Sequence, residues 1–176
     1  MIKSTIVAAL VSASISGAAF GGDLSGQASV IEGDTLEIHG ARIRLWGIDA
    51  PEPDQLCRNE SGKHYPCGQK AANDLDAFVA RRPVACVQVD RDQHKRAVAT
   101  CSVAGIDLAD WLVKSGLALD WPQNSNGAYA TAQSAAKRGN LGMWSGNFNE
   151  PWRYRSCRRT GGSAVSCSDL LNDSAF

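Results

Sequence analysis

The stretch TLEIHGARIRLWGIDAPE, residues 35–52, contains two strand-like runs separated by His39 and Gly40. A histidine–glycine pair suits a two-residue hairpin loop, because glycine readily takes the positive φ that such loops require. The second run continues into Asp49 and, beyond a proline, Glu52. Packing at a strand end requires no such carboxylates. Their use therefore depends on what the rest of the chain brings to the same place.

The order of predicted elements indicates a small barrel. Hydrophobic alternation and turn residues predict strands, whereas apolar residues at helical spacing predict helices. The expected strands are residues 27–31, 35–39, 42–48, 84–90 and 96–103, with 117–121 as a candidate sixth, and the expected helices are residues 68–82, 107–116 and 128–139. Five short strands with a helix between the third and fourth fit a mainly β, α+β fold, a five-stranded Greek-key barrel of the OB type with about three helices.

The chain of 176 residues predicts one domain with additions at both ends. Lys3, a short apolar run and small residues predict a signal peptide over residues 1–20, too short and serine-rich for a membrane-spanning helix. The barrel domain is expected over residues 21–148 and an irregular, cysteine-containing tail over 149–176. We therefore expect a secreted or periplasmic protein with no membrane span in the mature chain.

Six cysteines agree with export, because exported proteins meet oxidising conditions. Cys86 and Cys101 lie symmetrically about Gln93 and His94, between two strand-like runs, so a hairpin there makes them cross-strand neighbours. A zinc site is poorly supported, since the chain has no CxxC motif and its three histidines are scattered. The remaining disulfides are expected to be local ones, Cys57–Cys67 in one loop and Cys157–Cys167 in the tail.

Charge is balanced overall but uneven along the chain. A formal net charge of zero argues against a protein that holds nucleic acid by charge alone. Basic residues gather in two neighbourhoods, and a solvated surface is the simpler interpretation, favoured for the tail. These neighbourhoods are Arg81, Arg82, Arg91, Lys95 and Arg96, and in the tail Arg153, Arg155, Arg158 and Arg159.

Acidic residues lie on both sides of the first hairpin, in EGDT (residues 32–35) and GIDAPE (residues 47–52). Pairing about the predicted turn places Thr35 opposite Arg44, with Asp34 beside it. Strict alternation sends Asp34 and Arg44 to opposite faces of the sheet. A distortion near Gly33 or Gly47 is therefore expected if both residues serve one site.

These residue types together indicate phosphodiester hydrolysis. Carboxylates without histidine or cysteine partners suit Ca²⁺ or Mg²⁺, and the arginine fork suits phosphate. A cation polarises the phosphoryl oxygens, a carboxylate handles a water, and arginines neutralise the charge of the transition state. Each residue has a simpler structural explanation, as a turn residue, a strand-end cap or a solvated charge. A shared catalytic site explains four residues together more simply than four separate structural roles do. These residues are Asp34, Asp49, Arg44 and Arg96.

Several separate motifs resemble the staphylococcal nuclease (thermonuclease) family, in order and spacing over residues 29–144. They are EGDT, RLWGIDAPE, DQHKRAVATC, DLADWLVKSGLA and NLGMW. The extra cysteines resemble the secreted or periplasmic bacterial branch. The resemblance implies an OB-type barrel that uses Ca²⁺ to cleave DNA and RNA with little sequence preference, leaving 3′-phosphate ends. We expect a monomer and identify no protein partner.

The resemblance also implies roles for individual residues. Asp34 and Asp49 match the metal-binding aspartates, and Ala50 sits where the family uses a backbone carbonyl as a ligand. Glu32 matches a further acidic position near the metal, and Thr35 supports the set. The catalytic residues are then Glu52, which handles the attacking water, and the two arginines Arg44 and Arg96, which stabilise the transition state.

Two departures from the family pattern affect the grip on substrate. His94 and Lys95 stand where the family commonly has tyrosine and glycine, so Lys95 adds a cation near the phosphate path. The nucleotide-stacking tyrosines have no clear counterparts, and the nearest aromatic residue is Trp121. Trp121 could stack on a base or belong to the core.

Two other interpretations of function are open. The first is a non-catalytic OB module of the same family that binds nucleic acid or protein, against which the full set of catalytic residues counts. The second is a secreted accessory protein in polysaccharide production. It has little support, because no sugar-cleaving carboxylate pair is evident.

Overall fold

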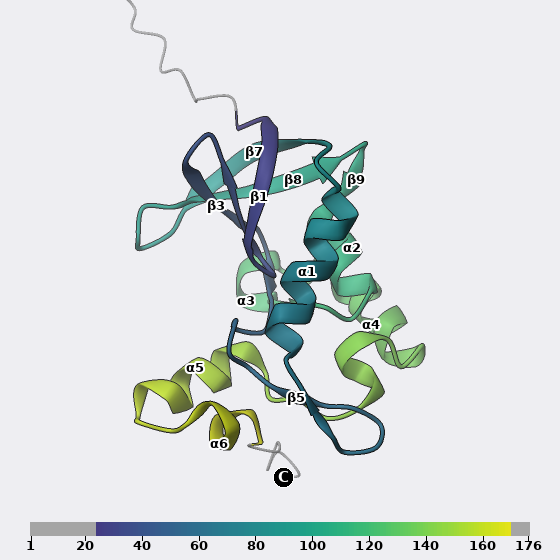
Figure 1. Ribbon diagram of the computed structural model, residues 1–176. Coiled ribbons are helices and arrows are strands. Elements are labelled where there is room, and N and C mark those ends of the chain that lie inside the picture. Colours follow the sequence, from purple (N-terminus) through teal and green to yellow (C-terminus); the bar gives the residue numbers. More distant parts are fainter. Residues whose placement is uncertain (1–23, 170–176) are drawn as a thin grey trace, which may run out of the picture.

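The computed structural model describes residues 24–169, and the predicted signal peptide lies outside them. The main sheet has the order β3-β2-β1-β7-β8-β9, and a parallel pairing of β3 with β8 closes the first five strands into a mixed barrel (Figure 1). The predicted OB-type barrel is therefore confirmed. Its strands are β1 (Gly26–Glu32), β2 (Thr35–Ile38), β3 (Ala41–Leu45), β7 (Pro83–Arg91) and β8 (Ala97–Val103), extended by β9 (Ile106–Asp107).

The β2–β3 hairpin turns where the sequence predicts. His39 and Gly40 both have positive φ, 52° and 78°, as a two-residue hairpin loop of the favoured twist requires. Thr35 pairs with Arg44 across the hairpin. The alternate side chains of both strands face the barrel core, where Leu36, Ile38, Ile43 and Leu45 are buried.

The β7–β8 hairpin carries the predicted cross-strand disulfide. Cys86 and Cys101 are directly paired in the ladder, and their Cα atoms are 4.1 Å apart. The hairpin turns at Gln93 and His94. The other two disulfides, Cys57–Cys67 and Cys157–Cys167, are also the predicted pairs.

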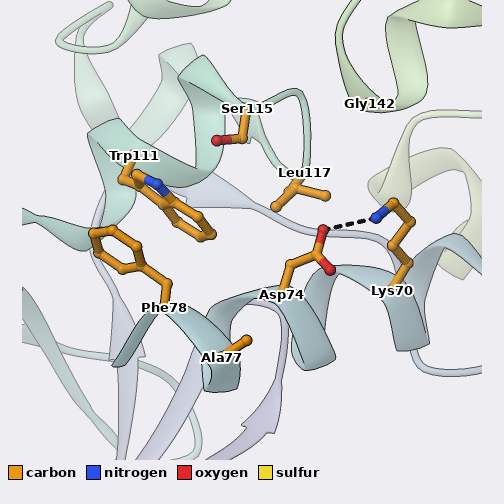
Figure 2. A pocket seen from close by; sticks show the side chains of 8 residues that line it. All are labelled: Lys70, Asp74, Ala77, Phe78, Trp111, Ser115, Leu117 and Gly142. Carbon is orange, nitrogen blue, oxygen red and sulfur yellow. Dashed lines mark hydrogen bonds and ion pairs between the residues drawn. The ribbon is translucent and has the colours of Figure 1, made fainter. Parts of the chain in front are cut away.

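Two helices cover the barrel. α1 (Cys67–Val79) buries Ala71, Leu75 and Val79, which share one helical face. Phe78 of α1 stacks on Trp111 of α2 (Leu108–Lys114), with ring centroids 4.1 Å apart. Figure 2 shows the hollow between these helices, about 460 Å³ in volume, which contains none of the predicted site residues.

Shorter elements complete the body of the molecule. β4 (Ile48–Asp49) pairs antiparallel with β10 (Leu119–Asp120), so the candidate sixth strand exists but forms a separate two-stranded sheet. None of the helices within residues 24–169 is long and apolar enough to cross a membrane. The remaining elements are β5 (Cys57–Arg58), β6 (His64–Tyr65), α3 (Pro122–Ser125), α4 (Ala130–Arg138) and the 3₁₀ helix η1 (Gly142–Ser145).

The predicted irregular tail is wrong for residues 151–159 and 164–168, which form α5 (Pro151–Arg159) and α6 (Ala164–Ser168). The described part of the chain thus has six α-helices, where about three were expected. Proline at the first position of α5 is favourable, because that position has no hydrogen bond to lose. The Ser163 and Ser166 side chains form a capping box that begins α6. The proposed division between barrel domain and tail stays a prediction.

The tail helices are fastened to the loop that follows the GIDAPE motif. The buried Gln55 side chain donates to the backbone carbonyl of Asn149, with a 2.6 Å distance from Nε2 to O. Asp169, directly after α6, accepts two hydrogen bonds from Arg58 and contacts His64. In Figure 1, α5 and α6 lie at the β5 end of the molecule. The tail is therefore packed against the loop that carries Glu52.

We expect replacement of Cys157 and Cys167 by serine to loosen α5 and α6 while leaving the barrel folded. A disulfide that closes a loop of this size typically contributes about 2–3 kcal/mol. Hydrogen exchange measured by mass spectrometry should accelerate in residues 151–169 and stay unchanged in the barrel strands. The matched control, Cys86→Ser with Cys101→Ser, should instead accelerate exchange in β7 and β8. Unchanged exchange in the tail of the first variant would contradict its dependence on the disulfide.

Candidate active site

The turn between β1 and β2 places Asp34 beside Arg44. The pairing of these strands is irregular between Val30 and Glu32, and the backbone N–H of Leu45 donates to the Asp34 carbonyl at 2.9 Å. Because Asp34 lies in the turn and not in a strand, strand alternation does not decide its direction. Its Oδ2 lies 3.1 Å from Nη2 of Arg44. The distortion that brings these residues together is therefore partly in this turn.

The second distortion is at Gly47, as predicted. Gly47 has φ +76° between β3 and β4, and a Cβ there would lie 3.0 Å from both Ser125 and Tyr129. The turn directs Asp49 back toward Arg44, with 2.7 Å between Arg44 Nη2 and Asp49 Oδ1. A single guanidinium therefore bridges the two aspartates of the predicted metal site.

Two hydrogen bonds orient the buried Asp34 carboxylate. Thr35 Oγ1 donates to one oxygen at 3.0 Å, and the backbone N–H of Ala50 donates to the other at 3.1 Å. Thr35 thus contacts the site through Asp34. Ala50 contacts Asp34 through its backbone N–H group, and the role of its carbonyl as a metal ligand stays a prediction.

Backbone contacts hold Glu52 in place. Its N–H donates to the side chain of Gln55 at 3.2 Å, and its carbonyl accepts from the Gln55 N–H at 2.9 Å. Gly68, in the first turn of α1, approaches the Glu52 carbonyl so closely that a Cβ at position 68 would overlap it. The position of Glu52 therefore depends on a glycine at the start of α1.

An arginine that the sequence did not assign to the site completes the cluster. Arg155 of α5 places Nη1 2.9 Å from Asp49 Oδ1 and Nη2 2.8 Å from Asp49 Oδ2. The same Nη1 lies 2.7 Å from Oε1 of Glu52. This bidentate arrangement is the strong form of an arginine–carboxylate pair. The interpretation of the tail arginines as solvated surface is therefore wrong for Arg155.

A second tail arginine contacts the same loop. Arg158 Nη2 lies 3.2 Å from Asp54 Oδ2. Arg155 and Arg158 are three residues apart, a spacing that places them on one helical face. The sequence signal that could have revealed this face is the proline that begins α5, followed by arginines at helical spacing and a cysteine within a local pair.

Trp121 lies beside both guanidinium groups of the cluster. Its ring centroid is 5.7 Å from Cζ of Arg44 and 6.0 Å from Cζ of Arg155. Such contacts are attractive because the face of the indole ring is electron-rich. Trp121 is half-buried at the site, which is compatible with contact to a substrate.

Other predicted residues are not joined to the cluster. Arg96 pairs with Asp92 in its own hairpin, 2.6 Å from Nε to Oδ2, and no ion pair links Arg96 to the three acids within residues 24–169. It directly precedes Ala97, the partner of Ile43 in the β3–β8 ladder. Lys95 is exposed at the same turn. Burial is the main reason why the pKa of Glu52 is raised, and the negative charge of Glu32 adds to this effect.

Burial and ion pairing have opposite effects on the pKa values of the charged groups in this cluster. Burial raises the pKa of Asp49 and of Glu52, while hydrogen bonds from Arg155 act in the opposite direction. Burial works against the charge of Arg155, but its bonds to Asp49 and Glu52 outweigh this and raise its pKa. Both arginines therefore stay charged. The raised pKa of Glu52 brings this carboxylate closer to the range in which it can exchange a proton near neutral pH.

The donor chemistry of the cluster suits Ca²⁺, but the arginine positions oppose it. Asp34 and Asp49 offer the hard carboxylate oxygens that Ca²⁺ prefers. Within the described residues, no group of three or more histidine, cysteine, aspartate or glutamate side chains is arranged to hold a metal. Both Asp49 oxygens already contact Arg155. Asp34 and Asp49 thus supply the donor chemistry for a cation, while Arg155 occupies both oxygens of Asp49.

The family model described as "Staphylococcal nuclease homologue" matches residues 42–146. The chain belongs to the staphylococcal nuclease family. This match covers Arg44, Asp49, Glu52 and Arg96, and it ends before α5. The family therefore supports a nuclease function for the barrel, and it says nothing of Arg155.

Proteins of similar sequence have been given different names. The chain is 45% identical over 141 residues to "Succinoglycan biosynthesis protein ExoI" of Rhizobium meliloti (strain 1021), covering 79% of this chain and 73% of that protein. It is 27% identical over 135 residues to an "Uncharacterized endonuclease" of Escherichia coli O157:H7, covering 72% and 82%. It is 28% identical over 154 residues to "Probable endonuclease lcl3" of Sclerotinia sclerotiorum, but spans only 55% of that relative.

We expect Gly68→Ala to displace Glu52 and lower activity, because the added Cβ overlaps the Glu52 carbonyl. Overpacking of this kind typically costs about 1–3 kcal/mol, more than the roughly 1 kcal/mol that alanine gains over glycine in a helix. Thermal unfolding and a nuclease assay measure the two effects. Gln69→Ala, at an exposed position in the same turn, is the control and should change neither. Full activity and stability of Gly68→Ala would contradict this account of Glu52.

Proposed function

We propose that the protein is a Ca²⁺-dependent nuclease that hydrolyses phosphodiester bonds of DNA and RNA with little sequence preference. We further propose 3′-phosphate products and a secreted or periplasmic location. The observation that carries the nuclease proposal is the Arg44 guanidinium, which bridges Asp34 and Asp49 at 3.1 and 2.7 Å with Glu52 three residues further along the chain. This juxtaposition supports the proposal, because a guanidinium suited to phosphate, two carboxylates suited to a cation and a candidate base belong to one cluster.

Each residue has a definite part in the proposed reaction. Asp34, Asp49 and the backbone carbonyl of Ala50 would hold the cation, which supplies polarisation of a phosphoryl oxygen when bound. Glu52 takes the proton of the attacking water. Arg44 neutralises negative charge on the phosphate as it develops, and Arg96 is proposed to do the same after release from Asp92.

The bonds that change are those at the phosphorus atom. The oxygen of a water forms a new bond to phosphorus while the bond from phosphorus to the 5′ oxygen breaks. The phosphate stays on the 3′ side, and the 5′ oxygen leaves as a hydroxyl after it takes up a proton. Water is the only co-substrate of this hydrolysis, and no atom changes its oxidation state.

Polysaccharide production is a second candidate role, favoured by the name of the relative that is 45% identical. That name describes a process and not a reaction, so it is compatible with a nuclease. The Arg44 guanidinium favours a phosphate substrate over a neutral sugar, because its planar fork can bind phosphate oxygens in a bidentate way. Direct action on polysaccharide is tested by incubation of the protein with acidic polysaccharide, followed by sizing of the polymer.

A non-catalytic binding module is the other alternative.

We expect Arg44→Ala and Glu52→Ala to lower DNA cleavage on the order of 10²–10³-fold, because each removes a contact to the transition state. The measurement is the initial rate on denatured DNA with the oxidised mature protein, in Ca²⁺ and in chelator. Arg42→Ala is the matched control on β3, since Arg42 is exposed and pairs with Glu37 outside the cluster. Wild-type protein and both site variants leaving the DNA equally intact in Ca²⁺ would show that the protein is not a nuclease.

Binding of single-stranded DNA should be weak and should fall as salt rises. The overall charge is zero, so affinity depends on a few phosphate contacts. For single strands the slope of log K against log salt is roughly −0.7 per phosphate contacted. We expect a slope corresponding to only a few phosphates, measured by fluorescence anisotropy with Glu52→Ala in chelator. Tight binding that is insensitive to salt would contradict this picture.

A further inference from the structure

We propose that Arg155 competes with the catalytic cation for Asp49 and also holds the catalytic Glu52, so that α5 keeps the cation site closed until the Arg155 guanidinium is displaced. This inference rests on the proposed function in one respect, namely that the acids bind Ca²⁺. It goes beyond that function because Arg155 lies outside the part of the chain that matches the family. The competing species is a divalent cation with a preference for carboxylate oxygens.

The contacts of Arg155 are with the oxygens that a cation needs. Its fork covers both oxygens of Asp49, at 2.9 and 2.8 Å, and one oxygen of Glu52, at 2.7 Å. The Asp49 side chain is 0% exposed, so a ligand reaches it only through groups that already touch it. A Ca²⁺ ion coordinated by the same oxygens, at about 2.3–2.6 Å, would overlap the guanidinium. The two occupants therefore exclude each other.

Electrostatics makes this exclusion mutual. Asp34, Asp49 and Glu52 carry three negative charges, and Arg44 and Arg155 carry two positive ones, so the cluster has a net charge of −1. A divalent cation added to this set changes the total to +1, whereas exchange for Arg155 leaves it at zero. Like charges at short range inside a protein repel strongly. Entry of the cation thus favours departure of Arg155, and the presence of Arg155 weakens cation binding.

Arg155 can leave the acids while α5 stays in place. The helix is held by the Cys157–Cys167 disulfide, by the Arg158–Asp54 ion pair and by the Gln55–Asn149 hydrogen bond. The Arg155 side chain is 28% exposed, which gives its long, flexible stem a route to solvent. The Trp121 ring already lies 6.0 Å from the guanidinium carbon while Arg155 contacts the acids. Only a side-chain rotation is required.

The test compares Ca²⁺ binding by wild-type protein, Arg155→Gln and the control Arg159→Gln. Arg159 lies on the same helix and is exposed. Isothermal titration calorimetry of protein freed of metal by chelator gives the dissociation constants. We expect Arg155→Gln to bind Ca²⁺ on the order of tenfold more tightly than wild type, and Arg159→Gln to match wild type. The melting temperature of Arg155→Gln should fall in chelator, where its acids repel each other, and should rise more on addition of Ca²⁺.

A second variant separates charge from folding. Arg155→Lys keeps the positive charge but loses the fork, so its Ca²⁺ affinity should lie between those of wild type and Arg155→Gln. If Arg155→Gln fails to fold, the comparison of Arg155→Lys with wild type decides the matter: tighter binding supports competition, and equal binding overturns it.

The outcomes distinguish this proposal from the proposed function. Equal or weaker Ca²⁺ binding by Arg155→Gln overturns the competition, and so does a fall in DNA cleavage at unchanged Ca²⁺ affinity, which would make Arg155 a catalytic residue. Absence of Ca²⁺ binding in every variant also overturns it. Tighter binding by Arg155→Gln in a protein that cleaves no DNA supports the competition while the nuclease proposal fails.

Discussion

The buried carboxylate of Asp49 is the constraint on which this structure depends. A charge removed from water requires charged or hydrogen-bonding partners, or it destabilises the fold. Asp49 has two arginines as partners, one from the barrel and one from the tail. Arg44 reaches it because Gly47 reverses the chain after β3, and Arg155 reaches it because α5 is packed on the neighbouring loop. The two halves of the site are thus joined by one ionised group.

The barrel supplies rigidity where the acids need it. Asp34 directly precedes β2 and Asp49 is the last residue of β4, and their backbones are tied to β3 and β10 by main-chain hydrogen bonds. Arg44 is in β3, and the pairing of β3 with β2 and β8 fixes the backbone position of Arg44. A site on such strands is positioned more precisely than one on loops alone. Glu52 lies beyond the strands, and Gln55 and Gly68 provide the fixed contacts that a strand would otherwise give.

Local patterns predicted much of this arrangement, and long-range ion pairs could not be predicted. The His39–Gly40 turn set the register of Thr35 and Arg44, and symmetry about Gln93 and His94 paired Cys86 with Cys101. The tail had a weaker signal, the proline and the spaced arginines, and no apolar periodicity, because only Pro151 and Tyr154 of α5 are buried. Its position is decided by polar contacts such as Arg155–Asp49, between residues 106 apart in sequence. Nothing in hydrophobic periodicity reports such a pair.

The tail therefore changes the site through charge more than through shape. With Arg44 alone, the three acids of the barrel would have a net charge of −2, which matches a divalent cation. Arg155 reduces this to −1 and occupies both oxygens of the most buried acid. The disulfide and the Gln55 contact hold the helix so that this one charge remains close to the acids. If Arg155 competes with a cation as proposed, a short disulfide-linked segment adjusts the cation affinity of the barrel without any change in the barrel residues themselves.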